Sequence, residues 1–261
     1  MAEPAVEVHA LEVSYGPLRI LHGIDLTVAK GQTVGVVGES GSGKSTLARA
    51  LVGSLRPTAG QVRIGDVDVT AVRGARRTSL RRKVQLIPQD PYSSLDPRRT
   101  IGAALAEAVD PRRANVKKHR DEIVGWLETV RLPADAVSRY PHELSGGQRQ
   151  RVAIARGLIL RPEVVIADEI TSALDVSVQA EILDLIARLR RELGVTMVFI
   201  SHNLAVVRQV SDEVVVLYRG EIVEHAATAT LFDHPRHEYT RTLLNAVPGA
   251  PGFDIEPRDA A

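Results

Sequence analysis

Residues 38–46 read Gly38-Glu39-Ser40-Gly41-Ser42-Gly43-Lys44-Ser45-Thr46, and they give the strongest indication of the fold. It matches the phosphate-loop pattern G-x-x-x-x-G-K-[ST] at every defined position. Its glycines let the backbone turn tightly, so that consecutive N–H groups point inward at a polyphosphate. In this pattern the lysine reaches the β- and γ-phosphates and the following serine hydroxyl binds Mg²⁺. We therefore expect a nucleoside triphosphate to be bound by Gly38, Ser40, Gly41, Gly43, Lys44, Ser45 and Thr46.

The residues on both sides of this loop give it the expected context. The apolar run Thr33–Val37 predicts a buried strand that enters the loop, and apolar residues over 47–52 predict a helix that begins at about Lys44. The N-terminus of that helix adds partial positive charge beside the phosphates. The alternative, a chance Gly/Ser-rich turn, does not account for a strand before the loop and a helix after it.

Composition limits the remaining functions. The chain has 261 residues, 44% hydrophobic and 25% charged, and its net charge is +1, so nothing global points to nucleic-acid binding. It has no cysteine, which excludes disulfides, thiolate zinc sites and iron–sulfur clusters. No apolar run approaches the roughly 18 residues that span a bilayer, and no secretory signal is visible. We expect a cytoplasmic protein that reaches a membrane only through a partner.

The order of strand and helix patterns predicts an α/β fold. Strands over 6–13 and 20–28 precede the loop as an antiparallel β layer, and buried strands are expected over 164–167 and 195–200. Residues 90–160 contain helical patterns, with Trp126 in the core, and predict a helical lobe inserted into the α/β core. We expect one domain over residues 1–247 and a mobile tail over 248–261, where prolines and glycines alternate with charges.

Two further features keep alternatives open. Tyr15 follows the first strand and either stacks on an adenine ring or is simply a hairpin aromatic. The segment 73–83 is dense in arginine; a solvated helix face explains it, while a nucleic-acid patch lacks interleaved aromatics.

Asp168 and Glu169 follow the buried strand 164–167. Mg²⁺ bridging phosphates prefers a hard carboxylate opposite the phosphate loop, which Asp168 supplies. Hydrolysis also needs a base or positioning group for water beside the γ-phosphate, a role that suits Glu169. The alternative is that the two acids only cap the next segment.

A second glycine-bearing loop, Leu144-Ser145-Gly146-Gly147-Gln148, stands at a predicted helix start and forms another anion site. One γ-phosphate does not need two such loops from one subunit. We expect this loop to close on a nucleotide held by a second subunit.

This set of motifs resembles the ATP-binding subunits of ABC transporters, over nearly the whole chain to about residue 247. The resemblance implies a P-loop NTPase core of the ABC ATPase type, with ATP and Mg²⁺ bound. It makes 144–148 the signature loop, Tyr15 the adenine-stacking aromatic, and Glu169 the catalytic carboxylate. It implies that Gln89 senses Mg²⁺ and the transmembrane partner, and that His202 contacts the γ-phosphate. The loop that crosses the dimer interface is Ser172, Ala173, Leu174 and Asp175.

One position departs from the family. Isoleucine, Ile170, stands where proline usually follows the catalytic glutamate, which removes a fixed φ and restores an N–H. No catalytic side chain is lost, so we expect a competent site.

A narrower resemblance, to oligopeptide/dipeptide importer ATPases, rests on residues 89–98 and 140–143. Residues 234–240, His-Pro-Arg-His-Glu-Tyr-Thr, are similar to the H-P-Y-T segment of that group, with a short insertion. It implies two ATPase subunits, head to tail, the second often a related paralogue. It also implies two permease subunits, an external substrate-binding protein and a place on the cytoplasmic face of the membrane.

Three alternatives remain open. Relatives of that importer group also carry nickel or opines. A soluble ABC ATPase of DNA repair or translation usually has two cassettes or a coiled-coil insertion, and exporters commonly fuse membrane helices to the ATPase.

Overall fold

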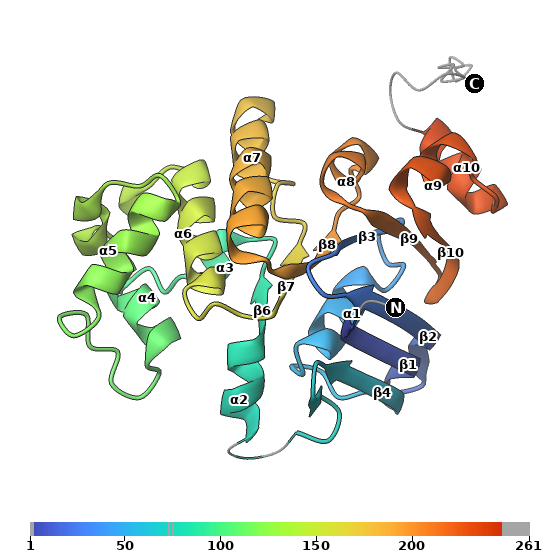
Figure 1. Ribbon diagram of the computed structural model, residues 1–261, viewed down its shortest axis with the longest axis horizontal. Helices are drawn as coiled ribbons and strands as arrows, with labels where there is room; N and C mark the ends of the chain where they lie inside the picture. The colour runs from blue at the N-terminus through green and yellow to red at the C-terminus, as the bar shows by residue number, and fades with distance from the viewer. Residues whose placement is uncertain (1–2, 73, 75, 247–261) are drawn as a thin grey trace, which may run out of the picture.

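The computed structural model of the protein describes residues 3–72, 74 and 76–246. Two β-sheets and several helices form its layers (Figure 1). The expected α/β fold with an antiparallel layer and helices between β6 and β7 is confirmed.

The central sheet has six strands in the order β10-β9-β3-β8-β7-β6. Neighbours from β9 to β6 run parallel, and β10 pairs antiparallel with β9. The bounds are β3 Thr33–Val37, β6 Val84–Ile87, β7 Val164–Asp168, β8 Thr196–Ile200, β9 Glu213–Tyr218 and β10 Glu221–Ala227. Parallel strands covered on both faces are made of continuous β-branched runs, as in β3, whose five residues are all buried.

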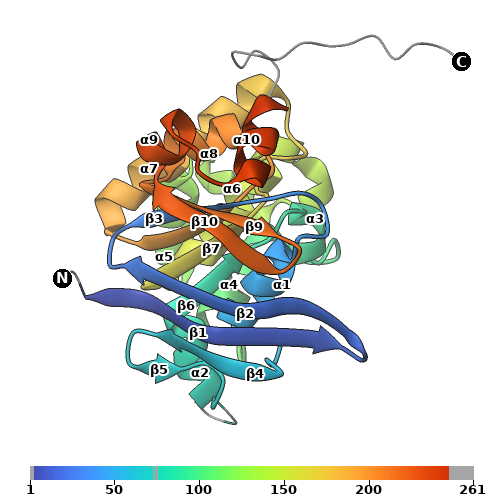
Figure 2. The same ribbon diagram turned by 90° about the vertical axis from the view of Figure 1, so that its right-hand side faces the viewer.

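The second sheet is antiparallel, in the order β2-β1-β4-β5. Its bounds are β1 Pro4–Tyr15, β2 Leu18–Ala29, β4 Ala59–Ile64 and β5 Val67–Asp68. Figure 2 shows this sheet as a separate layer below the central one. Buried and exposed residues alternate along β2, as expected of a sheet with one face in the core.

The alternation of side chains along the central strands divides the core in two. Val164 and Ile166 of β7 face the antiparallel layer, while Val165 and Ala167 face the other side. The helix after the phosphate loop, α1 (Lys44–Leu51), buries its apolar face in the core shared with the antiparallel layer. The opposite core is covered by α6 (Gly146–Leu158), α7 (Val176–Leu193) and α8 (Leu204–Val210).

Residues 88–163 join β6 to β7 and contain helices only. Their bounds are α3 Pro91–Ser94, α4 Ile101–Val109, α5 Arg120–Thr129 and α6, with 3-10 turns at Ala134–Ser138 and Pro141–Glu143. Trp126 is buried in this group, as its helical spacing predicts. Figure 1 shows these helices gathered on one side of the central sheet.

Several elements differ from the sequence expectation. The helix expected over 116–130 begins only at Arg120, because residues 111–119 form turns. The short strand expected over 222–223 extends through Glu221–Ala227, since its pairing with β9 outweighs its polar sequence. Sequence periodicity missed α8 and α9 (Thr228–Asp233), which have only one or two helical turns.

Two expectations reach beyond the described residues. The terminal helix, expected over 237–247, is α10 (Glu238–Asn245), and residue 247 lies outside the described chain. The mobile tail expected over 248–261 also lies outside it. The arginine-rich segment forms α2 (Arg76–Lys83), whose described side chains are mostly exposed, as a solvated helix face requires.

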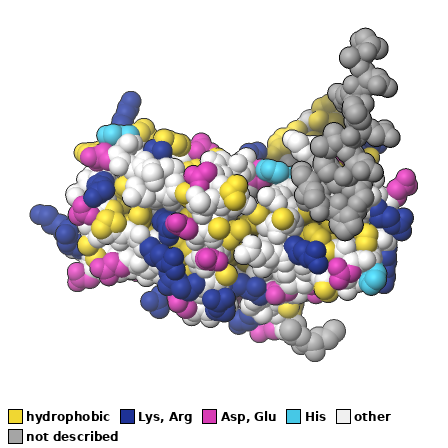
Figure 3. Space-filling view, turned by 90° about the horizontal axis from the view of Figure 1, so that it is seen from above, with side chains coloured by type: hydrophobic (Ala, Val, Ile, Leu, Met, Phe, Trp, Pro, Cys, Tyr) yellow, Lys and Arg dark blue, Asp and Glu magenta, His cyan; other side chains and the backbone are white. Residues whose placement is uncertain are grey.

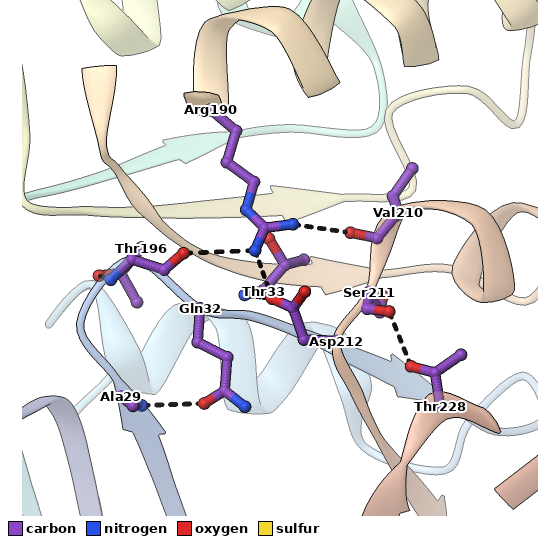
Figure 4. Close-up of polar contacts among 10 residues, drawn as sticks. Ala29, Gln32, Thr33, Arg190, Thr196, Val210, Ser211, Asp212 and Thr228 are labelled. Carbon is purple, nitrogen blue, oxygen red and sulfur yellow. Dashed lines mark hydrogen bonds and ion pairs between the residues drawn. The ribbon is translucent and has the colours of Figure 1, made fainter. Parts of the chain in front are cut away.

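The amino ends of the central strands are joined by a polar cluster, drawn in Figure 4. The guanidinium of Arg190 on α7 pairs with Asp212 and donates to the carbonyls of Gly31 and Val210 at 3.3 and 3.5 Å. The Asp212 carboxylate also accepts the N–H of Thr33 at 2.7 Å. This cluster fixes the starts of β3 and β9, at the edge opposite the phosphate loop.

Candidate nucleotide site

The phosphate loop joins the carboxyl end of β3 to α1. Gly43 is the N-cap of α1 and has φ +109°, a left-handed conformation that glycine adopts without steric cost. No side chain caps α1, so within the described chain the N-terminal N–H groups of this helix have no side-chain acceptor. An anion held in the loop would supply that acceptor.

Two glycines of the loop are required by close packing. A Cβ on Gly38 would lie 2.1 Å from the carbonyl oxygen of Leu217, and one on Gly43 would lie 2.7 Å from a methyl of Leu21. The loop is therefore pressed between the end of β9 and the strand β2. A side chain at position 38 would force the backbone to shift, whereas one at position 43 would displace the Leu21 methyl and would have to adopt a positive φ.

Lys44 is buried and folds back over its own loop. Its ammonium donates to the carbonyl oxygens of Gly38 and Glu39, each at 2.8 Å. Burial lowers the pKa of Lys44, and the nearby carboxylates of Glu169 and Asp168 oppose that shift. The Lys44 ammonium therefore stays on its own loop, near enough to the two carboxylates at the end of β7 to interact with them electrostatically.

Asp168 is the last residue of β7, which β8 separates from β3, and its carboxylate reaches the hydroxyl of Ser45 in the loop. Burial raises the pKa of Asp168, and the Ser45 hydroxyl partly offsets this. Its Oδ1 atom is buried and has no hydrogen-bond partner among the described residues. A buried carboxylate oxygen that accepts no hydrogen bond, together with a serine hydroxyl, is a set of oxygen ligands that fits Mg²⁺.

Glu169 and His202 meet beyond the ends of β7 and β8. Nδ1 of His202 lies 3.3 Å from Oε2 of Glu169. The N–H of Glu169 donates to the Ile200 carbonyl at 2.9 Å, and its φ is +48°. A left-handed conformation at a glutamate is strained and persists only where the surroundings enforce it, often at functional sites. The next residue, Ile170, is buried in the core.

Gln89 and the segment 172–175 are linked to Glu169 through the side chain of Ser172. Nε2 of Gln89 donates to Oγ of Ser172 at 3.3 Å, and that hydroxyl donates to the carbonyl of Glu169 at 2.9 Å. Asp175 is the N-cap of α7 and accepts the N–H of Val178 at 2.9 Å. The Ser172 hydroxyl therefore bridges the side chain of Gln89 and the backbone of Glu169.

Tyr15 ends β1 as an exposed aromatic, paired with Leu18 at the hairpin turn. No contact links its ring to the phosphate loop within the described chain. The hairpin links Tyr15 to the phosphate loop indirectly: Val13 pairs with Leu21, and Leu21 packs on Gly43. Its side chain is therefore partly exposed at the end of the hairpin that supports the loop.

The loop 144–148 is built as a helix start. Ser145 caps α6, its Oγ accepting the N–H of Gln148 while Oε1 of Gln148 accepts the N–H of Ser145. A Cβ on Gly147 would lie 2.6 Å from a methyl of Val178, so α6 and α7 approach closely here. Leu144 is buried, and Gly146 lies beside Leu174.

The structure brings some predicted residues together and keeps others apart. Lys44, Ser45, Asp168, Glu169, His202 and Gln89 gather at the carboxyl edge of the central sheet. The loop 144–148 does not join them within the described chain: α6 stands with the lateral helices, away from α1 (Figure 1). The chain therefore has two glycine-bearing helix starts, at α1 and α6, that stand apart in the fold.

Sequence reasoning missed contacts made by aromatic residues. Tyr239 of α10 accepts the N–H of Glu39 in the phosphate loop at 3.0 Å. Arg149 of α6 lies 3.8 Å over the ring of Tyr92, three residues after Gln89. Both tyrosines stand in segments singled out by resemblance, but no pattern in the sequence indicates what they touch.

Comparison with known proteins identifies relatives that match most of the chain. The family described as ABC transporter matches residues 21–172, more than half of the chain. A putative peptide import ATP-binding protein of Brucella ovis is 46% identical over 250 residues, covering 94% of this chain and 79% of that protein. The di/tripeptide transport ATP-binding protein DppF of Pseudomonas aeruginosa is 46% identical over 235 residues, covering 90% and 73%.

Solved structures share the fold. CbiO1 of Clostridium perfringens, described as part of the ABC transporter complex CbiONQ, has a TM-score of 0.79 and 26% identity, covering 94% of this chain and 96% of that one. The ATP-binding cassette MJ0796, solved as a dimer in a post-hydrolysis state with ADP and phosphate, has a TM-score of 0.76 and 28% identity, covering 85% and 98%.

Proposed function

This chain belongs to the ABC transporter family, and from that premise we propose that it is the ATP-hydrolysing subunit of a peptide importer. The names of the relatives, which refer to peptide import and di/tripeptide transport, favour peptides over nickel or opines as cargo. The observation that carries the proposal is the cluster of Lys44, Asp168, Glu169 and His202 beside a glycine-rich helix start.

In this proposal the phosphate loop binds the ATP polyphosphate through backbone N–H groups and Lys44. The Ser45 hydroxyl and the unpartnered Oδ1 of Asp168 would hold Mg²⁺, which neutralises charge that develops on the phosphates. Glu169 orients the attacking water and takes its proton, and His202, 3.3 Å away, holds the carboxylate and reaches the γ-phosphate. Tyr15 stacks on the adenine.

Two subunits are needed to complete each site. The loop 144–148 is a capped helix start on α6, and α6 stands away from α1 of its own chain (Figure 1). We propose that it closes on ATP held by a second ATPase subunit, with residues 172–175 crossing the interface. The relative MJ0796 was solved as a dimer, which supports this arrangement. ATP closes the pair because its γ-phosphate contacts exist only in the closed state.

The helices between β6 and β7 would carry this closure to permease subunits. Gln89 contacts Ser172 on the nucleotide side, and α3 begins two residues later. The ring of Tyr92 lies under Arg149, and the carbonyl of Ser94 accepts a hydrogen bond from Arg156, so α3 and α6 move together. A displacement at Gln89 therefore reaches the loop 144–148 through α6.

We place the working protein at the cytoplasmic face of the membrane, attached through permeases. Among the described helices none has the length and apolar character to cross a bilayer. On the face seen in Figure 3, positive and negative side chains are interspersed, and hydrophobic ones are scattered.

Isolation from native membranes tests the proposal. The tagged chain would be extracted in mild detergent and its copurifying subunits identified by mass spectrometry. Two permeases and a second ATPase are expected, and the purified complex should hydrolyse ATP faster when a peptide-loaded binding protein is added. Recovery of the chain only in the soluble fraction, or with nucleic-acid machinery, would overturn the transport function and leave the ATP site intact.

A further inference from the structure

The last helix of the described chain touches the phosphate loop. The N–H of Glu39 donates to the hydroxyl of Tyr239 at 3.0 Å, although the two residues are 200 positions apart. Tyr239 is 9% exposed, so little water reaches this contact. The residue lies in the segment 234–240, for which the proposed hydrolysis cycle has no use.

The contact acts on a peptide group that also binds Lys44. The carbonyl of Gly38 and the N–H of Glu39 belong to one planar peptide unit. Its carbonyl accepts the Lys44 ammonium at 2.8 Å, and its N–H donates to Tyr239. One rigid plane is thus held from both ends, by the lysine that binds phosphate and by the tyrosine of α10.

The ring of Tyr239 is itself fixed by β9. It lies against the ring of Tyr218, with centroids 4.0 Å apart and planes at 31°. The residue before, Leu217, places its carbonyl where a Cβ on Gly38 would be. The end of β9 therefore supports both partners of the hydrogen bond, the loop and the tyrosine.

The approach of α10 is fixed by a buried carboxylate. Glu224 on β10 accepts the N–H groups of Arg236 and His237 at 2.9 and 3.0 Å. Burial raises the pKa of Glu224, but hydrogen bonds, those of Thr240 and the two N–H groups, outweigh it and lower the pKa. His237 then caps α10, its Nδ1 accepting the N–H of Tyr239 at 3.1 Å. The backbone N–H groups of Arg236, His237 and Tyr239 are thus all held by side-chain acceptors.

We propose that Tyr239 is a positioning residue of the nucleotide site, which orients the Gly38–Glu39 peptide and through it Lys44. The carboxy-terminal helix then sets how well the loop is preorganised for ATP. This inference rests on the proposed function, because it requires nucleotide phosphates in the loop. Preorganisation raises affinity by reducing the ordering that binding requires.

The test measures nucleotide affinity of the full chain by titration calorimetry, with Mg²⁺ and a non-hydrolysable ATP analogue. Tyr239→Phe keeps the ring and removes the hydroxyl, and loss of one neutral hydrogen bond corresponds to an affinity about five-fold weaker. Tyr218→Phe is the matched control: it removes a hydroxyl from the same ring pair, and we expect wild-type affinity. A melting curve of each variant shows that it is folded at the temperature of titration.

Two outcomes would overturn the inference. If Tyr239→Phe melts at a lower temperature but binds the analogue as wild type does, the tyrosine is only structural. If Tyr218→Phe weakens binding as much, the hydroxyl of Tyr239 is not responsible.

Two further variants complete the design. Glu224→Gln weakens the hold on residues 236 and 237 without touching the loop, and we expect a smaller loss of affinity in the same direction. In a Lys44→Ala background, Tyr239→Phe should cause little additional loss, because its effect passes through Lys44. If the wild-type chain does not bind the analogue, the proposed function itself is contradicted. A loss of affinity confined to Tyr239→Phe leaves the proposed function intact.

Discussion

Nδ1 of His202 lies 3.3 Å from Oε2 of Glu169, and the two residues come from the ends of neighbouring parallel strands, β7 and β8. The side chain of His202 is 59% exposed and that of Glu169 only 17%. The histidine therefore covers the carboxylate on the side open to solvent.

Glu169→Gln should retain ATP binding and lose turnover. Gln cannot take a proton, and a general base is worth roughly 10²–10⁴-fold in rate. Because ATP is then not hydrolysed, the closed pair of subunits should accumulate. Steady-state phosphate release measures the first effect and light scattering after gel filtration measures the second. Glu221→Gln, on an exposed glutamate of β10, is the control, and full turnover by Glu169→Gln would remove Glu169 from its assigned role.

Lys44→Ala should weaken nucleotide binding by about 10- to 100-fold, the range for hydrogen bonds to a charged group. Burial has already removed water from the ammonium, so its contact with phosphate has little desolvation cost. Fluorescence titration with a labelled nucleotide measures the change. Lys30→Ala, at the exposed turn before β3, should bind normally; equal affinity of both variants would contradict the phosphate contact.

Asp168→Asn should separate stability from activity. Burial raises the pKa of Asp168, so its folded state holds the proton more tightly than the unfolded chain does. Stability from this group is present at low pH and is lost as the pH rises through the folded-state pKa, above the ordinary range of an Asp carboxyl. The nucleotide-free variant should then be more stable than wild type at neutral pH, by on the order of 1 kcal/mol.

That difference should close as the pH falls and Asp168 becomes protonated, while Mg²⁺-dependent ATPase activity is lost at every pH. Urea unfolding at several pH values measures the stability, with Asp184→Asn, on the exposed face of α7, as the control. A variant less stable than wild type at neutral pH would show that the Asp168 charge is stabilised by partners without nucleotide.

Arg190→Gln should lower the free energy of unfolding by about 1–2 kcal/mol, because it breaks hydrogen bonds to a carboxylate and two carbonyls at a partly exposed site. These bonds fix the amino ends of β3 and β9, while the nucleotide binds at the carboxyl ends. Nucleotide affinity should therefore change little. Denaturant titration measures the stability, and Arg191→Gln, exposed and next in sequence, should have no effect.

Local patterns in the sequence were enough to predict most secondary-structure elements and the chemistry of the motifs that they carry. Thr33–Val37 and the helix start at Lys44 have the bounds that were predicted, because the signals for a buried strand, a glycine turn and a helix start all lie within a few residues. The order of strands and motifs also predicted the α/β fold. Short helices such as α8 were not predicted, because one or two turns show little periodicity.

Contacts between segments far apart in the sequence could not be predicted from local patterns. Nothing near Tyr239 in the sequence indicates that its hydroxyl meets Glu39, and nothing near His202 indicates its distance from Glu169. Such contacts depend on which strands become neighbours and how closely they pack, a free energy summed over the whole core rather than over one segment. Motifs read within single segments thus predict the chemistry of each loop, whereas the packing of the central sheet brings Lys44, Asp168 and Glu169 together and leaves the loop 144–148 on the lateral helices.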